Sequence, residues 1–151
     1  MSRDLEISFN SPQCGWMSVG FKSADSEFNT TTAHAPYKNA LSEILSAAAA
    51  FASGEDFSEL TVLWNRDPEE YEFNFESLDG VGSIEIVEYA DSEKNDGETV
   101  FSYSGNARSI ASAFEATFAQ MYDERDVDEF TENWHQGFPK EGLEELRRAL
   151  A

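Results

Sequence analysis

A six-residue stretch near the middle of the chain alternates aromatic and polar side chains without a break: Tyr71-Glu72-Phe73-Asn74-Phe75-Glu76. Successive side chains of a β-strand point to opposite faces of the sheet, so this alternation predicts a strand. The aromatic face is expected to be buried. The opposite face, formed by Glu72, Asn74 and Glu76, is expected to meet water or a partner.

Other short segments rich in β-branched or aromatic residues, bounded by turn residues, predict six further strands at residues 4–9, 16–22, 27–33, 60–64, 84–89 and 99–103. Turn signals join the last four strands at residues 65–70, 79–82 and 95–97. These short connections predict an antiparallel meander. The Thr-rich segment 27–33 lacks a clear apolar face, so we predict an edge strand exposed on both sides.

The hydrophobic period changes to three and four residues in two longer segments, residues 37–52 and 106–122. This spacing predicts two amphipathic helices. Either Ser104 or Asn106 is expected to cap the second helix. A short helical turn is predicted at residues 130–134, and a last amphipathic helix at residues 139–150.

The order of these elements indicates an α+β fold. We predict a single antiparallel sheet of about six to seven strands, with the two main helices packed on one face and a C-terminal helix beyond them. No linker or repeat divides the sequence. The chain is therefore expected to form a single domain, residues 1–151, with a helical C-terminal extension at residues 123–151.

Acidic residues outnumber basic ones by 30 to 10, which gives a formal net charge of −20 at pH 7. A field of this sign repels nucleic acid and anionic membranes, so we expect neither as a partner. It attracts basic proteins and speeds their encounter with the chain. An alternative is that the acidity only keeps the protein in solution or reflects a salt-adapted host.

The chain contains a single cysteine, Cys14, so no intramolecular disulfide can form. The first residues lack the basic start and apolar run of a signal peptide, and no stretch approaches the roughly 18 apolar residues of a membrane helix. These features favour a cytoplasmic protein.

No familiar catalytic, metal or nucleotide motif is present. His34 and His135 are far apart in the sequence, and neither has another ligand at metal-binding spacing. Cys14 lies in a Pro/Gly turn without a helix start to activate it. The acidic segment 91–97 departs from a calcium-binding loop and is predicted to be a hairpin turn. We therefore expect a protein that is not an enzyme and has no cofactor.

Two clusters remain as candidate partner sites. The first is the polar strand face of Glu72, Asn74 and Glu76. The second lies in the acidic segment that follows the second main helix, where carboxylates are interleaved with aromatic residues, and its candidates are Asp126, Asp128, Glu129 and Trp134. Charges that steer and aromatic residues that anchor are typical of a site for a basic protein. The alternative is a solvated face with Trp134 packed beneath it.

A set of features in residues 15–122 resembles the small acidic immunity proteins of bacterial polymorphic-toxin and contact-dependent inhibition systems. They are the strand at Gly15-Trp16, the helix opening at Tyr37-Lys38-Asn39-Ala40-Leu41, the Trp64 strand followed by Asp67-Pro68, the strand from Tyr71 to Phe75, and the helix at Asn106. This resemblance implies a cytoplasmic, non-enzymatic bacterial protein that binds a cognate toxin domain and blocks its active site. It assigns no individual residue to the contact.

The sequence also allows a different class of function, in which the chain is a structural or assembly subunit. Such a subunit would associate with itself through an edge strand or the open sheet face, and a homodimer is its simplest form. In that case the acidity serves solubility alone.

Overall fold

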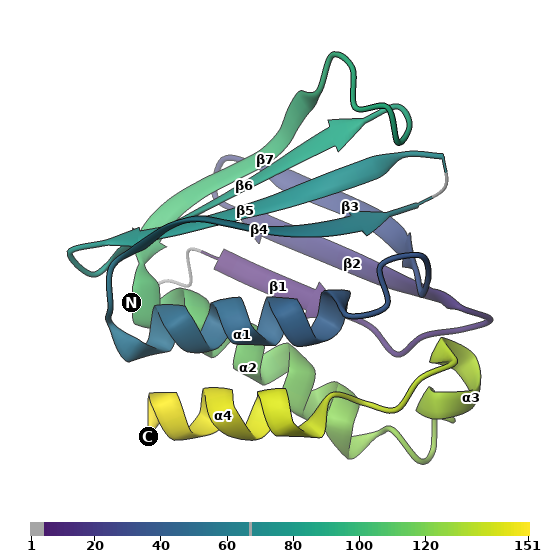
Figure 1. Ribbon diagram of the computed structural model, residues 1–151. Helices are drawn as coiled ribbons and strands as arrows, with labels where there is room; N and C mark the ends of the chain where they lie inside the picture. Colours follow the sequence, from purple (N-terminus) through teal and green to yellow (C-terminus); the bar gives the residue numbers. More distant parts are fainter. Residues whose placement is uncertain (1–4, 67) are drawn as a thin grey trace.

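The computed structural model describes residues 5–66 and 68–151. Asp4 of the first predicted strand and Asp67 of the predicted turn lie outside the described residues. In chain order the elements are β1 (Leu5–Phe9), β2 (Trp16–Ser23), β3 (Glu27–Ala33), α1 (Ala40–Ser53), β4 (Phe57–Asn65), β5 (Glu70–Leu78), β6 (Val81–Tyr89), β7 (Glu98–Asn106), α2 (Ala107–Asp123), α3 (Phe130–Trp134) and α4 (Lys140–Leu150) (Figure 1).

The strand predicted from the central alternation is β5, and its two faces differ as expected. Tyr71 and Phe73 are fully buried and Phe75 is 2% exposed. Glu72 and Asn74 on the other face are partly exposed, and Glu76 is exposed. The predicted four-stranded meander is also confirmed, because β4, β5, β6 and β7 pair in that order and every pair is antiparallel.

The predicted single sheet is wrong. The described strands form two antiparallel sheets, one of β1, β2 and β3 and one of β4 to β7, although the α+β class holds. The chain between β3 and β4 forms α1, and β3 meets β4 and β5 of the other sheet through side chains instead of a backbone ladder. The indole Nε1 of Trp64 donates to the carbonyl of Ala33 at 2.8 Å, and the hydroxyls of Thr30 and Tyr71 are 2.6 Å apart.

Aromatic rings from both sheets form one core. Phe21 of β2 lies 6.0 Å from Phe73 and 5.6 Å from Phe101, measured between ring centroids. Phe9 of β1 lies 6.0 Å from the ring of Trp64. Because these rings are buried, the inner faces of the two sheets exclude water together, although no backbone hydrogen-bond ladder joins them.

The helices complete the core on one side of the four-stranded sheet, and no helix of the described residues covers the opposite face of that sheet (Figure 1). The side chain of Asn106 accepts a hydrogen bond from the Ser109 amide at 2.9 Å, so Asn106 is the cap of α2. The hydroxyl of Thr117 in α2 accepts from the Phe9 amide at 2.8 Å and donates to the Phe9 carbonyl at 3.3 Å. Helix α2 is thereby tied to the edge of β1.

The outermost helix, α4, packs against α1 and α2. Its buried residues are Leu143 and Leu146, at the spacing predicted for an amphipathic helix. Gly142 of α4 lets this helix approach α1, because a Cβ at this position would lie 3.1 Å from side-chain atoms of Leu45 in α1. Among the described residues, no helix has the length and apolar content needed to cross a bilayer.

Strand β3 is an edge strand, as predicted, since among the described strands it pairs only with β2. The expectation that it is exposed on both sides is wrong. Phe28, Thr32 and Ala33 are buried because this strand packs against the four-stranded sheet. The Phe28 ring contacts Tyr71 edge-on, with centroids 5.6 Å apart. Strand β3 therefore has a buried inner face, which its Thr-rich sequence did not predict.

Candidate functional site

The outer face of the four-stranded sheet contains the first predicted cluster. Strand register places Glu85 of β6 directly beside Asn74, and Ser83 beside Glu76. We call Glu72, Asn74, Glu76 and Glu85 the acidic sheet face. Because directly paired residues of an antiparallel sheet share a face, all four side chains project to the side without helices (Figure 1).

Two side chains of this face, Asn74 and Glu85, accept hydrogen bonds from uncharged hydroxyl groups. Asn74 accepts from the Thr61 hydroxyl at 2.6 Å, and Glu85 accepts from the Thr99 hydroxyl at 3.1 Å. The Glu76 side chain is exposed, and its carboxylate forms no hydrogen bond or ion pair with a described residue. The carboxylates of the face are therefore left with little positive charge around them.

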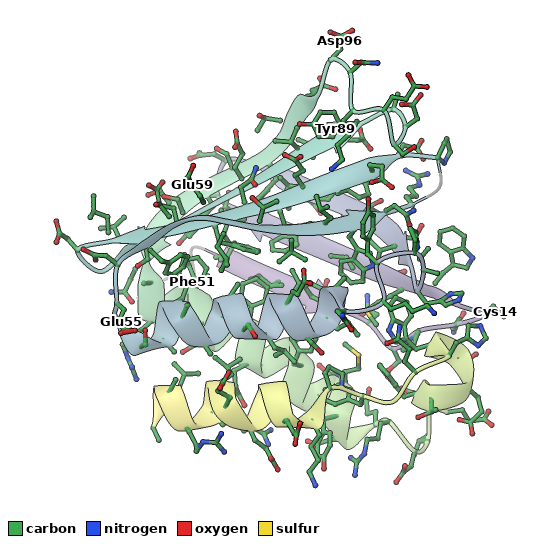
Figure 2. All side chains as sticks on the ribbon, viewed as in Figure 1. Cys14, Phe51, Glu55, Glu59, Tyr89 and Asp96 are labelled. Atoms are coloured by element: carbon green, nitrogen blue, oxygen red, sulfur yellow. The ribbon has the colours of Figure 1, made fainter. Side chains whose placement is uncertain are left out.

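Lys94 is the one cation that pairs with this face within the described chain, and it lies 3.6 Å from Glu72. The Tyr89 hydroxyl donates to the same carboxylate at 3.4 Å. Desolvation, followed by the charges of Glu72 and Glu85, raises the pKa of the Tyr89 phenol. Figure 2 shows Tyr89 on the upper side of the sheet, with Asp96 at the tip of the β6–β7 connection.

The second predicted cluster lies in residues 123–136, which we call the α3 segment. Asp126 and Glu129 are exposed, whereas Asp128 is half-buried and accepts a hydrogen bond from the Ser11 hydroxyl at 2.6 Å. Glu129 has a positive φ of 52°, a region that residues other than Gly, Asn and Asp seldom adopt. The three candidate carboxylates thus divide into two exposed groups, Asp126 and Glu129, and one, Asp128, that is hydrogen-bonded within the fold.

Trp134 does not serve as a surface anchor in this structure. Its side chain is 2% exposed, and its ring meets Trp64 edge-on with centroids 6.1 Å apart. Trp134 therefore packs against the core. This agrees with the second interpretation of the sequence, in which Trp134 lies beneath a solvated face. Phe130, in the same short helix, is buried in the same way.

A pocket of about 530 Å³ lies beside the α3 segment. Asp126, Glu129 and Glu132 line it, together with Arg125 and Lys140, so positive and negative groups are mixed at its rim. The guanidinium carbon of Arg125 lies 3.7 Å from the Tyr122 ring centroid, and its Nη1 donates to the Tyr122 carbonyl at 2.6 Å. This pocket has less net negative charge around it than the sequence run suggests.

The two clusters occupy different parts of the molecule. The acidic sheet face belongs to the upper layer in Figure 1, whereas α3 lies at the lower right, below the β1–β2 loop. No described contact joins them. They are therefore two separate candidate surfaces, and the structure does not combine their carboxylates into one site.

Sequence reasoning missed a buried carboxylate at the end of the acidic sheet face. Glu70 is 3% exposed, and its Oε1 accepts a hydrogen bond of 2.5 Å from the Tyr37 hydroxyl. This hydrogen bond, and secondarily burial, raises the pKa of Tyr37 to about 12. The alternation places Glu70 on the same face as Glu72, and nothing in the sequence shows that the β3–α1 connection covers it.

Sequence reasoning also missed the contact between the two histidines. The ring centroids of His34 and His135 are 4.5 Å apart, although 100 residues separate them in the chain. Cys14 is exposed in the neighbouring β1–β2 loop. Across residues 5–66 and 68–151, no group of three or more His, Cys, Asp or Glu side chains is placed to hold a metal ion.

Comparison of the chain with protein-family models, curated proteins and solved structures found no significant match.

Proposed function

We propose that this protein is a non-enzymatic binding protein that neutralises a basic protein partner, such as a bacterial toxin domain, by covering its functional surface. The acidic sheet face is the proposed contact. The supporting observation is that Glu76 and Glu85 project from an uncovered sheet face without a cationic partner among the described residues. A positively charged surface would supply the missing counter-charges.

The net charge supports the same proposal at longer range. Of the 30 acidic residues in the sequence, two form ion pairs with lysine or arginine within the described chain, Glu72 with Lys94 and Glu115 with Arg147. Unpaired surface charge attracts an oppositely charged protein before contact and raises the association rate. The outer rows of the face add hydroxyl and aliphatic groups, including Thr61, Leu63 and Val87, that can be desolvated at a contact.

Self-association through an edge of the four-stranded sheet receives less support. Both edge strands of the four-stranded sheet carry an extra residue, in β4 between Phe57 and Leu60 and in β7 opposite Ile86 and Val87. Such bulges interrupt the row of backbone groups that a second strand would need. We therefore favour a different protein as partner over a copy of this chain.

The first experiment is affinity capture from a lysate of the source cells at low salt, followed by a high-salt wash and mass spectrometry of the bound proteins. We expect one basic protein in near-stoichiometric amount. Recovery of the bait alone, or of a mixture that any acidic protein collects, would contradict the proposal.

The captured partner then allows the surface to be tested by charge reversal. We expect the double variant E76K/E85K to slow association at low salt by about tenfold or more, because both changes replace attraction with repulsion. The matched control is E6K/E27K, which alters the total charge equally on the outer face of the three-stranded sheet. Equal slowing by both variants would show that net charge alone matters and would remove the acidic sheet face from the proposal.

A further inference from the structure

Two imidazole rings meet where three parts of the chain converge. His34 follows β3, His135 ends α3, and Gly15 of the β1–β2 loop lies against both rings. A Cβ on Gly15 would be 2.8 Å from His34 Nδ1 and 3.4 Å from His135 Nε2. The ring of His34 also meets Trp134 edge-on at 6.3 Å between centroids. Because the centroids of the two imidazole rings are 4.5 Å apart, protonation of both rings would place two positive charges in close contact.

Hydrogen bonds tie the α3 segment to the loop at this point. The Gly15 amide donates to the Asn133 carbonyl at 2.6 Å, and the Cys14 amide donates to Asn133 Oδ1 at 3.2 Å. From the other side, Gln136 Nε2 donates to the His34 carbonyl at 3.5 Å. Figure 2 shows Cys14 at the tip of this loop. Because the Cys14 and Gly15 amides bond to Asn133, their protection from exchange reports whether the α3 segment is docked.

The elements around the two rings carry other titratable and charged groups: Cys14 in the loop, Tyr37 and Lys38 in the β3–α1 connection, and Asp128, Glu129 and Glu132 in the α3 segment. None of these groups forms a hydrogen bond or ion pair with either imidazole within the described chain. Carboxylates therefore do not neutralise a second positive charge by direct contact. Neutral rings can pack edge to face, whereas two charged rings at this distance repel.

We propose that His34 and His135 form a pH-sensitive clasp. When at least one ring is neutral, the clasp holds the α3 segment against the β1–β2 loop. When both rings are protonated, their repulsion favours release of the segment, because separation relieves it. Protonation of imidazole is favoured as the pH falls, so the segment is docked more firmly at higher pH. This inference goes beyond the proposed function and does not depend on it.

Residue-resolved hydrogen exchange tests the clasp directly. Protection factors of the Cys14 and Gly15 amides are measured by NMR at pH 5 and pH 8, corrected for intrinsic exchange, with β5 amides as an internal reference. We expect protection at these two amides to fall by about tenfold toward pH 5, relative to β5, because the repulsion acts only in the docked state. An unchanged ratio would overturn the proposal.

Variants identify the groups responsible. In His135→Asn the second charge cannot form, and Asn tolerates the positive φ of 68° at this position, so we expect less than about a twofold pH effect. His34→Gln, on the other side of the contact, should have the same effect. The matched control Glu132→Gln removes a nearby carboxylate and should keep the pH effect of the unaltered protein. A tenfold fall that persists in both histidine variants would assign the effect to other groups and overturn the proposal.

Discussion

The two sheets have similar inner faces and different outer faces. Each contributes buried aromatic rings to the same core, as the contact between Phe21 and Phe73 shows. The outer face of the four-stranded sheet carries carboxylates. The outer face of the three-stranded sheet has small neutral residues in its two middle rows, formed by Ser8, Gly20 and Asn29 and by Asn10, Ser18 and Thr31.

Gly20 shows how closely the neutral face is packed. A Cβ at this position would lie 2.6 Å from Asn29 Oδ1 and 3.0 Å from Ser8 Oγ, so the polar side chains of the neighbouring strands lie over the glycine. The acidic sheet face instead extends its carboxylates outward. Alternation along a strand therefore determines which side is buried in both sheets, and the residue types at the outward positions determine what each sheet can attract.

The largest predicted effect concerns what the sheets share. Phe21→Ala and Phe73→Ala should each lower the free energy of unfolding by about 3–5 kcal/mol, because each removes a fully buried ring and leaves a cavity. Urea denaturation measures both values. Because the two rings are in contact, the double variant should lose less than the sum.

Substitutions on the outer faces serve as controls for this first comparison. Ser18→Ala and Thr61→Ala affect exposed side chains of the two sheets and should change stability by less than about 0.5 kcal/mol. A small loss for only one of the two phenylalanines would show that the sheets do not share the core equally.

An intermediate effect is expected for the polar link between the sheets. The Tyr71 hydroxyl donates to Glu88 Oε2 at 3.1 Å and lies 2.6 Å from the Thr30 hydroxyl of β3. Tyr71→Phe keeps the ring and removes these bonds, so unfolding should become easier by about 1–2 kcal/mol in thermal or urea denaturation. Thr30→Ser retains the hydroxyl and should remain close to the unaltered protein. Equal stability of Tyr71→Phe and the unaltered protein would mean that this hydroxyl adds nothing to the joining of the sheets beyond packing and the bond of Trp64 to Ala33.

The smallest effect appears only at high pH, at the end of the acidic sheet face. The hydrogen bond to Glu70, and secondarily burial, raises the pKa of Tyr37 to about 12. An unfolded tyrosine titrates near pH 10, so this bond contributes fully below about pH 10 and is lost as the pH rises through about 12. The stability difference between the unaltered protein and Tyr37→Phe should be constant up to pH 10 and shrink above it.

Urea titrations from pH 8 to pH 12 would measure this difference. Tyr89→Phe is a suitable comparison, because Tyr89 donates a longer bond, of 3.4 Å, to Glu72 on the same sheet face. A difference for Tyr37→Phe that stays level to pH 12 would contradict a raised pKa in the folded state.

Local patterns in the sequence were sufficient to predict the elements. All seven predicted strands and the predicted helices form, and the short helix matches its predicted range at residues 130–134. The division into two sheets was not predictable, because alternation reports which side of a strand is buried and carries no information on which strand lies beside it. Burial of Trp134 was one of the two alternatives that the sequence left open, whereas burial of Glu70 was missed, because the segment that covers it is distant in the chain.

The same limit applies to the candidate sites. Glu72, Asn74 and Glu76 share one outer face, as their spacing on a strand requires. The contact of His34 with His135 had no signal in the sequence. Both residues lie outside the helices and strands, so no periodic pattern indicates which residues they contact.

The hydroxyl of Thr117 occupies the position that a neighbouring strand would take beside β1. By bonding both the amide and the carbonyl of Phe9, it uses the backbone groups through which another chain could add to this edge. The chain has twelve phenylalanines and several strands rich in aromatic residues, so strand addition at an open edge would favour aggregation at high concentration or during refolding. A helix residue thus gives the smaller sheet a protection against fibre-like stacking that its short first strand does not provide alone.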